Sequence, residues 1–389
     1  MRDLARVRAR IRRAKPKHGR PRACGVRPRS FHSGGIRRDP SVNSISGQPE
    51  GLPGGQGGAG GPVDAFRPAG SLAFHSMSAP ESTLVYTTAS GRAFVGDAIE
   101  TLQLECPDDS VDLIVTSPPF ALLRPKEYGN KSQEDYVRWF QPFADEFWRV
   151  LKPTGSLVLD LGGAWESGHP VKSIYQFELL VSLCRRPEFR FYLAQDFYWF
   201  NPARLPSPAQ WVTIKRVRAK DSINYLWWLS KTPEPKADNG KVVREYTAAM
   251  KRLLESGTYN RGRRPSGHVI REGFTNDRGG AIPPNLLAVS NTGNDNRYRA
   301  GCNAADLPIH PARYPEEIPR FFIELLTDPA DLVVDPFAGS NMTGQVAEVL
   351  ARRWLSIDIE QDYVQGSRYR FEALQPELAT LSADPSHAD

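Results

Sequence analysis

Short apolar runs alternate with amphipathic stretches along most of the sequence, and this alternation limits the folds that the chain can adopt. Runs continuous enough to form strands buried on both faces occur at 111–117, 155–163, 193–200, 223–231, 332–340 and 354–360. Stretches with helical spacing occur at 132–152, 173–186, 317–328 and 343–353. Strands that alternate with helices predict an α/β fold with a doubly wound, mostly parallel sheet.

Residues 1–80 differ from the rest in charge and composition. Residues 1–40 hold 14 Lys+Arg against 2 Asp+Glu, whereas the whole chain has a net charge of +6, so the remaining residues carry −6. The Gly/Pro-rich stretch 47–63 cannot bury enough apolar surface to offset its ordering entropy. We therefore expect a disordered extension over 1–80 and a disordered tail over 376–389. A basic arm on DNA phosphates and an Arg-rich transit peptide are the alternatives for the extension.

The cysteines and the hydropathy pattern bear on the class of protein. Cys24, Cys106, Cys184 and Cys302 lie far apart and form no CxxC pair, which favours reduced thiols over a disulfide framework or a zinc site. No apolar run approaches the length needed to span a bilayer. We expect a cytoplasmic protein with no metal and no membrane partner.

One predicted strand leads into a loop suited to a nucleoside-type cofactor. The strand at 332–340 passes through Asp335 into the small residues Gly339 and Ser340 and then into a helix, which permits close backbone approach to a ligand. Neither a GxGxxG fingerprint nor the Gly-Lys-Ser/Thr of a P-loop is present. Asp358 and Glu360 follow at about twenty residues, where an acid commonly accepts hydrogen bonds from ribose hydroxyls.

The strand at 111–117 ends in Ser117-Pro118-Pro119-Phe120, and the prolines cannot continue a sheet ladder. They form a rigid platform at the carboxyl end of a strand, where open α/β sheets bind ligands. If the Ser117 hydroxyl and the Pro118 carbonyl accept the hydrogens of an exocyclic amine, the nitrogen lone pair can point at an electrophilic methyl group. Phe120 would stack on a base that has left the duplex. A sharp exit turn with a capping serine is the alternative.

These segments together resemble a known family. "TSPPF" followed by "HPARYPEEIPRFFIELLTDPADLVVDPFAGSNMTG" resembles the amino-methylating, β-type DNA methyltransferases, whose motif order is circularly permuted so that the catalytic loop precedes the cofactor loop. "VTSPPFALLRPKEYGN", "VLDLGGAW", "DFYWFNPARLPSP", "RPSGH" and "GGAIPPNLL" are similar in particular to the PvuII-type cytosine-N4 modification methyltransferases. The resemblance covers 85–372 and implies an S-adenosylmethionine-dependent methyltransferase fold with a small DNA-recognition insert. The implied parts are a catalytic half at 81–240, a target-recognition region at 241–305 and a cofactor-binding half at 306–375.

The resemblance also implies roles for individual residues. Ser117, Pro118, Pro119 and Phe120 would hold the target amine and base. Asp160 would polarise the serine hydroxyl and relay a proton. An ordinary aspartate at the end of a strand is the alternative. The residues implied around S-adenosylmethionine are Asp335, Phe337, Gly339, Ser340 and Asn341 at the methionine part, Asp358 with Glu360 at the ribose, Asp97 at the adenine end, and His310 and Pro311 in a segment that packs on the cofactor.

The catalytic motif bears on which atom of DNA would be methylated. A serine in the first position of the catalytic motif favours cytosine N4 over adenine N6, where Asp or Asn usually stands. Cytosine C5 methylation needs a cysteine nucleophile, typically in Pro-Cys, and the sequence has no such pair. An adenine-N6 methyltransferase and a non-catalytic DNA-binding protein with a retained methyltransferase fold stay open as alternatives.

Two basic segments are candidates for contact with double-stranded DNA. Residues 251–301 contain nine Lys+Arg and four acids, and Arg263, Arg264 and His268 are candidate base contacts. Phosphate contacts are expected from Lys215, Arg216, Arg218 and Lys220. A solvated loop and a basic strand face are the respective alternatives. The resemblance implies a CAGCTG-like site and the protection of DNA from a cognate restriction endonuclease. Because a modification enzyme need convert only one strand at a time, we expect a monomer.

Overall fold

The computed structural model of the protein describes most of residues 82–372. The described ranges are 82–121, 132–187, 190–257, 262–263, 265–267, 269–270, 273, 276–293 and 295–372, and they belong to one unit of the chain. The predictions for 1–80 and 376–389, and part of the catalytic-loop segment, lie outside the described residues.

The described residues form one large sheet, a short two-stranded ribbon and helices. The strands are β1 (Thr83–Thr87), β2 (Gly91–Val95), β3 (Val111–Thr116), β4 (Leu151–Gly162), β5 (Tyr192–Phe200), β6 (Ile223–Ser230), β7 (Gly262–Arg263), β8 (Val269–Ile270), β9 (Leu286–Ala288), β10 (Leu332–Asp335) and β11 (Arg353–Asp358). The α-helices are α1 (Ala98–Glu105), α2 (Tyr136–Val150), α3 (Tyr175–Arg185), α4 (Ala248–Ser256), α5 (Asn296–Ala304), α6 (Glu317–Leu326), α7 (Met342–Val349) and α8 (Gln361–Ser367). Shorter turns are the π-helix η1 (Gln210–Ile214) and the 3-10 helices η2 (Asn239–Val242) and η4 (Arg368–Arg370).

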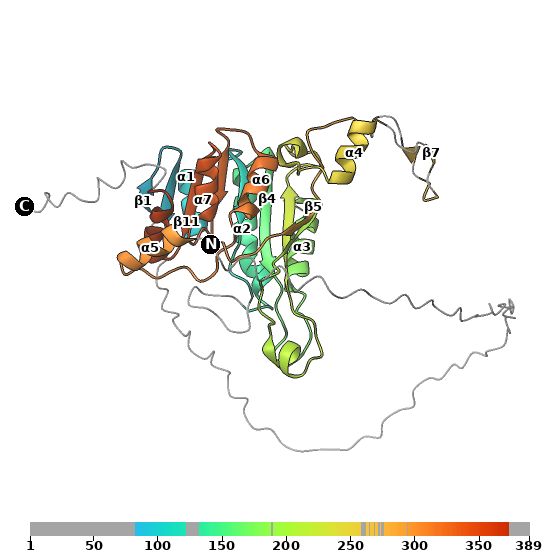
Figure 1. Ribbon diagram of the computed structural model, residues 1–389. Coiled ribbons are helices and arrows are strands. Elements are labelled where there is room, and N and C mark those ends of the chain that lie inside the picture. The colour runs from blue at the N-terminus through green and yellow to red at the C-terminus, as the bar shows by residue number, and fades with distance from the viewer. Residues whose placement is uncertain are drawn as a thin grey trace, which may run out of the picture. The chain divides into compact units, whose positions relative to one another are not determined.

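The nine-stranded sheet has the order β1-β2-β11-β10-β3-β4-β6-β5-β9 (Figure 1). The strands β2, β11, β10, β3 and β4 pair in parallel, and so do β5 and β9. The pairs β1–β2, β4–β6 and β6–β5 are antiparallel. The prediction of a mostly parallel sheet is therefore confirmed, with β1 and the inserted strand β6 as the exceptions, each antiparallel to its neighbours.

Helices cover both faces of the sheet, as a doubly wound fold requires. On one face, α1, α2 and α3 pack on the sheet through the buried side chains of Leu102, Phe147 and Leu179. On the other face, α6, α7 and α8 pack on it through residues such as Phe322 and Val346. The central strand β3 is buried along its whole length because both layers cover it.

Sheet register sets the place of the predicted site. The strands β3 and β10 are neighbours, with Val333 opposite Leu113 and Val334 opposite Ile114. Because the two strands are parallel, the loops that follow them leave from the same edge of the sheet. The loop that follows β3 and begins with Ser117 is called the catalytic loop, and the loop 336–341 between β10 and α7 is called the cofactor loop. The two loops are far apart in the sequence but therefore lie side by side.

The predicted target-recognition region, 241–305, contains more regular structure than its sequence indicated. Its last part contributes β9, which pairs with β5 in the main sheet, and α5, whose buried Cys302 thiol lies against the carbonyl of Gly366 at 3.8 Å. These two elements belong to the scaffold, so α4 and the β7–β8 ribbon are the described elements of this region that extend away from it (Figure 1). The basic segment 215–220 lies in the loop between β5 and β6, which Figure 1 shows extending beyond the sheet, and is not a strand.

Candidate active site

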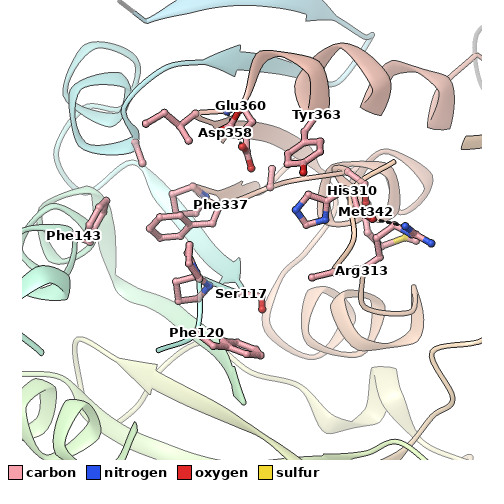
Figure 2. A pocket seen from close by; sticks show the side chains of 18 of the residues that line it. Ser117, Phe120, Phe143, His310, Arg313, Phe337, Met342, Asp358, Glu360 and Tyr363 are labelled. Atoms are coloured by element: carbon pink, nitrogen blue, oxygen red, sulfur yellow. Dashed lines mark hydrogen bonds between the residues drawn. The ribbon is translucent and has the colours of Figure 1, made fainter. Parts of the chain in front are cut away.

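A cavity of about 450 Å³ opens at the carboxyl edge of the sheet. Figure 2 shows Ser117 and Phe120 on one side of it, Asp358, Glu360 and Tyr363 on the opposite side, and Phe337 between them. Its volume falls within the range of about 300–1,000 Å³ that is usual for small-molecule sites. Mixed aromatic and acidic walls suit a nucleoside with a charged, partly apolar tail.

The catalytic loop holds Ser117 against a carboxylate from the neighbouring strand. The Ser117 hydroxyl donates a hydrogen bond to Asp160 Oδ2 at 3.2 Å. Pro118, Pro119 and Phe120 follow it along the wall of the cavity. Phe120 lies across β4 at Gly162, where a Cβ atom would come within 2.6 Å of the Phe120 ring, so only glycine leaves room for this ring position.

Asp160 is buried, and its other carboxylate oxygen also accepts a hydrogen bond. Asn224 Nδ2 on β6 donates to Asp160 Oδ1 at 3.0 Å. Burial raises the pKa of Asp160 to about 6, although the hydrogen bonds from Asn224 and Ser117 and the charge of Arg204 oppose that rise. A carboxylate with such a pKa is ionised at neutral pH. Because its pKa is close to neutral pH, it can also take up and release a proton.

The cofactor loop bends tightly at Gly339. Its φ of +51° is one that residues with a side chain rarely adopt, and a Cβ atom there would lie 2.8 Å from His310 Nε2. The Gly339 N–H donates to Asp358 Oδ2 at 2.7 Å, and the Glu360 N–H donates to Asp358 Oδ1 at 3.0 Å. Asp358 thus braces the loop, and a carboxylate has further lone pairs with which to accept a ribose hydroxyl.

The remaining predicted cofactor residues divide into two groups. Asp97, His310, Phe337, Ser340 and Glu360 line the cavity. Asp97 Oδ1 also accepts the N–H groups of Ile99 and Glu100 as the N-cap of α1. The other group is buried below the loop: Asp335 is 2% exposed and Asn341 is 1% exposed. Their side chains shape the loop and do not form the surface of the cavity.

An aromatic wall completes the cavity, and the sequence analysis missed it. Phe143 and Trp139 on α2 pack on Phe337 with ring centroids 5.1 and 6.1 Å away, and Tyr363 on α8 meets His310 edge-on at 4.6 Å. Trp139 and Phe143 are four residues apart, so they share one face of α2. That spacing was visible in the sequence, but an ordinary core stripe has the same pattern.

A second cavity, of about 650 Å³, adjoins the first on the Ser117 side. Pro311 lines this cavity, as do Asp160, Asn201, Arg204 and Asn224. Ser117, Phe120 and Tyr314 line both cavities, so the two meet at the catalytic loop. An extruded base could therefore reach Ser117 from the second cavity while the first holds another ligand.

The predicted DNA contacts are only partly described. Lys215, Arg216, Arg218 and Lys220 are exposed in the loop between β5 and β6. Arg264 and His268 lie outside the described residues, as does the side chain of Arg263.

Two absences hold for the described part of the chain. No group of three or more His, Cys, Asp or Glu side chains there is arranged to hold a metal ion. None of its helices is both long enough and apolar enough to cross a membrane.

Replacing Gly339 by alanine should weaken S-adenosylmethionine binding by about tenfold or more, because the new Cβ would displace the His310 ring in addition to a backbone strain of about 1–2 kcal/mol. Isothermal titration calorimetry with the purified variant measures the loss. Gly168→Ala is the matched control, since Gly168 also has a positive φ, +75°, but no atom within 4 Å of its would-be Cβ. Equal affinities of both variants for S-adenosylmethionine would contradict the proposal that the close approach of Gly339 to His310 shapes the cofactor site.

Comparison with known proteins agrees with this geometry. The sequence profile of the family described as DNA methylase matches residues 111–368. The type II methyltransferase M.PvuII of Proteus hauseri is 49% identical over 288 residues, which are 74% of this chain and 85% of that protein. M.BglII of Bacillus subtilis, also a type II methyltransferase, is 28% identical over 276 residues, 70% of this chain and 66% of that protein.

A solved structure is similar as well. The PvuII DNA methyltransferase (cytosine-N4-specific) superposes with a TM-score of 0.60 at 43% sequence identity, and the match covers 76% of this chain and 92% of that one. The profile spans both the catalytic loop and the cofactor loop, whose residues line one cavity. This chain belongs to the DNA methylase family.

Proposed function

We propose that this protein is a site-specific DNA methyltransferase that transfers a methyl group from S-adenosylmethionine to N4 of cytosine in double-stranded DNA. The observation that carries the proposal is the meeting of Ser117 and the Gly339 loop at one cavity. The likeness to M.PvuII and to a solved cytosine-N4-specific enzyme supports the choice of base. The role that follows is that of the modification enzyme in a type II restriction–modification system.

S-adenosylmethionine fits the first cavity by its chemistry. When bound, it supplies an electrophilic methyl group. Asp358 and Glu360 would accept hydrogen bonds from ribose hydroxyls, the aromatic wall of Phe337 and Trp139 would contact the apolar parts, and the Gly339 turn would allow close approach of the backbone.

The catalytic loop would prepare the amine for attack. The Ser117 hydroxyl uses its single hydrogen on Asp160, so its lone pairs remain to accept one amino hydrogen of cytosine, while the Pro118 carbonyl accepts the other. The nitrogen lone pair is thereby drawn out of conjugation and turned towards the first cavity. Phe120, held across Gly162, would stack on the extruded base.

Methyl transfer leaves one proton too many on the nitrogen. As the nitrogen–carbon bond forms and the sulfur–carbon bond breaks, the amine becomes positively charged and must lose a proton. Ser117 can pass that proton to Asp160, whose pKa of about 6 lets the carboxylate accept it at neutral pH and release it later to solvent.

The DNA would lie over the second cavity. The exposed cations of the β5–β6 loop suit phosphate contacts, and segment 244–281 is the candidate for reading bases at a CAGCTG-like site. A monomer suffices, because each strand can be modified separately. We expect the protein in the cytoplasm, on the nucleoid when DNA-bound, with a cognate restriction endonuclease as its functional partner.

The product of the reaction tests the proposal directly. Plasmid DNA incubated with the protein and S-adenosylmethionine should yield N4-methyldeoxycytidine when digested to nucleosides and resolved by mass spectrometry. N6-methyldeoxyadenosine would overturn the base assignment. If no methylated nucleoside forms under saturating conditions, the alternative of a non-catalytic DNA-binding protein is favoured.

Replacing Ser117 by alanine should lower the single-turnover rate by about 10²-fold, because one preorganised acceptor at the amine is lost. Affinity for S-adenosylmethionine should stay near that of the wild type. Ser110→Ala, directly before β3, is the matched control, since the Ser110 hydroxyl donates to the carbonyl of Pro107 at 2.6 Å and does not line the cavity at Ser117. A loss of cofactor affinity in the Ser117 variant would remove the serine from the proposed role.

The rate should also depend on the protonation of Asp160. Above pH 6 the carboxylate is ionised and can accept a proton, and below pH 6 it is protonated, so the rate should fall about tenfold per pH unit there. Single-turnover rates measured between pH 5 and 8, with DNA and cofactor saturating, report this limb. An equally steep acid limb in Asp160→Asn would assign the titration to another group.

A further inference from the structure

A chain of hydrogen bonds runs from the loop between β5 and β6 to Ser117. Arg204 Nη1 donates to Asn224 Oδ1 at 2.8 Å, and Asn224 Nδ2 donates to Asp160 Oδ1 at 3.0 Å. Ser117 Oγ donates to the second oxygen of Asp160, at 3.2 Å. Asn224 and Asp160 are 6% and 5% exposed, so water has little access to the bond between these two side chains.

We propose that Arg204 is a positioning residue for methyl transfer, which acts through Asn224 to keep Asp160 ionised and aimed at Ser117. The proposal rests on the function proposed above, because Asp160 has a part in the reaction only if Ser117 holds the target amine. It assigns a task to two residues, Arg204 and Asn224, that the mechanism above does not use.

The orientation of the Asn224 amide connects Arg204 to the charge of Asp160. An amide has an acceptor end and a donor end, and rotation by half a turn exchanges them. A guanidinium can only donate hydrogen bonds. Arg204 therefore favours the orientation of the amide in which its oxygen faces the guanidinium. The NH₂ group must then face Asp160, where it can bond only to an oxygen that accepts, as the ionised carboxylate does. With the amide reversed, its oxygen would face Asp160 and favour the protonated acid.

The positive charge of Arg204 also acts on Asp160. Asp160 is buried, and burial favours the protonated form, so a positive charge nearby is needed to offset it. The charge of Arg204 lowers the pKa of Asp160, as do the bonds from Asn224 and Ser117. The other titratable groups that face it are Tyr175 from α3 and Tyr314 from the segment before α6. Burial raises the pKa of both phenols, so both stay neutral and neither replaces Arg204.

The position of Arg204 in the chain connects Asp160 to the loop between β5 and β6. It lies at the base of the β5–β6 loop, the segment that carries the exposed cations, and lines the second cavity together with Asp160 and Asn224. Lys220 Nζ, across that loop, donates to the carbonyls of Pro202 at 3.0 Å and Arg204 at 3.1 Å. The place of the guanidinium therefore depends on the loop proposed to meet DNA phosphates.

The test is the acid limb of the single-turnover rate in Arg204→Met, measured between pH 5 and 8.5 with saturating DNA and cofactor. The midpoint should rise by about one pH unit, so the variant is about fivefold slower at pH 6, about tenfold slower at pH 5, and approaches the wild-type rate at high pH. Arg204→Lys keeps a positively charged side chain that can only donate hydrogen bonds, so its midpoint should lie close to that of the wild type. Asn224→Ala breaks the next link and should move the midpoint in the same direction.

The matched control is Arg218→Ala, which removes one charge from the same loop. Arg218 donates to the carbonyls of Pro170 and Val217 and has no bond to Asn224, so its loss should weaken DNA binding without moving the acid limb. If the Arg204 and Asn224 variants both keep the wild-type midpoint, the proposal is wrong, and weaker DNA binding alone would make Arg204 a direct DNA contact. Wild-type product is quantified as N4-methyldeoxycytidine in the same samples, so failure of the proposed function appears there separately.

Discussion

The buried carboxylate of Asp335 is the junction on which the site depends. Its Oδ1 accepts the Thr116 hydroxyl at 2.7 Å and the Phe337 N–H at 3.2 Å, and its Oδ2 accepts the hydroxyls of Tyr314 at 3.0 Å and Thr343 at 2.6 Å. These four donors come from the end of the catalytic strand, the cofactor loop, the segment before α6 and the start of α7. Burial raises the pKa of Asp335 while the donors oppose the rise, so removal of one donor would leave a buried, underbonded carboxylate.

This junction explains how a permuted order of motifs still yields one site. Ser117 and Gly339 are more than two hundred residues apart in the sequence, yet β3 and β10 are bonded at both ends. At the start of the strands the Leu332 N–H donates to Asp112 Oδ2 at 2.9 Å, and at their carboxyl ends Thr116 meets Asp335. A one-residue slip would break both links and turn the buried side chains of β3 to the opposite face. Register and polar contacts therefore specify the same alignment.

The sequence predicted the scaffold well because its signals are local. Continuous apolar runs identified the buried strands β3, β4, β10 and β11, and the catalytic and cofactor loops lie where parallel strands end. The aromatic wall and the links through Asn224 were not predictable, since each depends on partners from distant segments. Asn224 looked like one polar residue in an apolar strand, and only the pairing of β6 with β4, with Asp160 opposite Leu226, brings it to the carboxylate. The regular structure in 241–305 was missed because β9 has only three residues and α5 is polar.

The two cavities share a boundary, and this boundary is the place where a methyl group would cross. Ser117, Phe120, Tyr314 and Met342 line both sides. Met342 begins α7 directly after Asn341, whose Oδ1 accepts the N–H of Gly344 at 3.0 Å and the hydroxyl of Ser356 at 2.6 Å, so the helix start is held firmly. A methionine at this boundary is apolar and adaptable, and it can close the gap around a small group without offering it a hydrogen bond. Exclusion of water there would strengthen the electrostatic influence of Asp160 on the amine, because fewer water dipoles screen the charge.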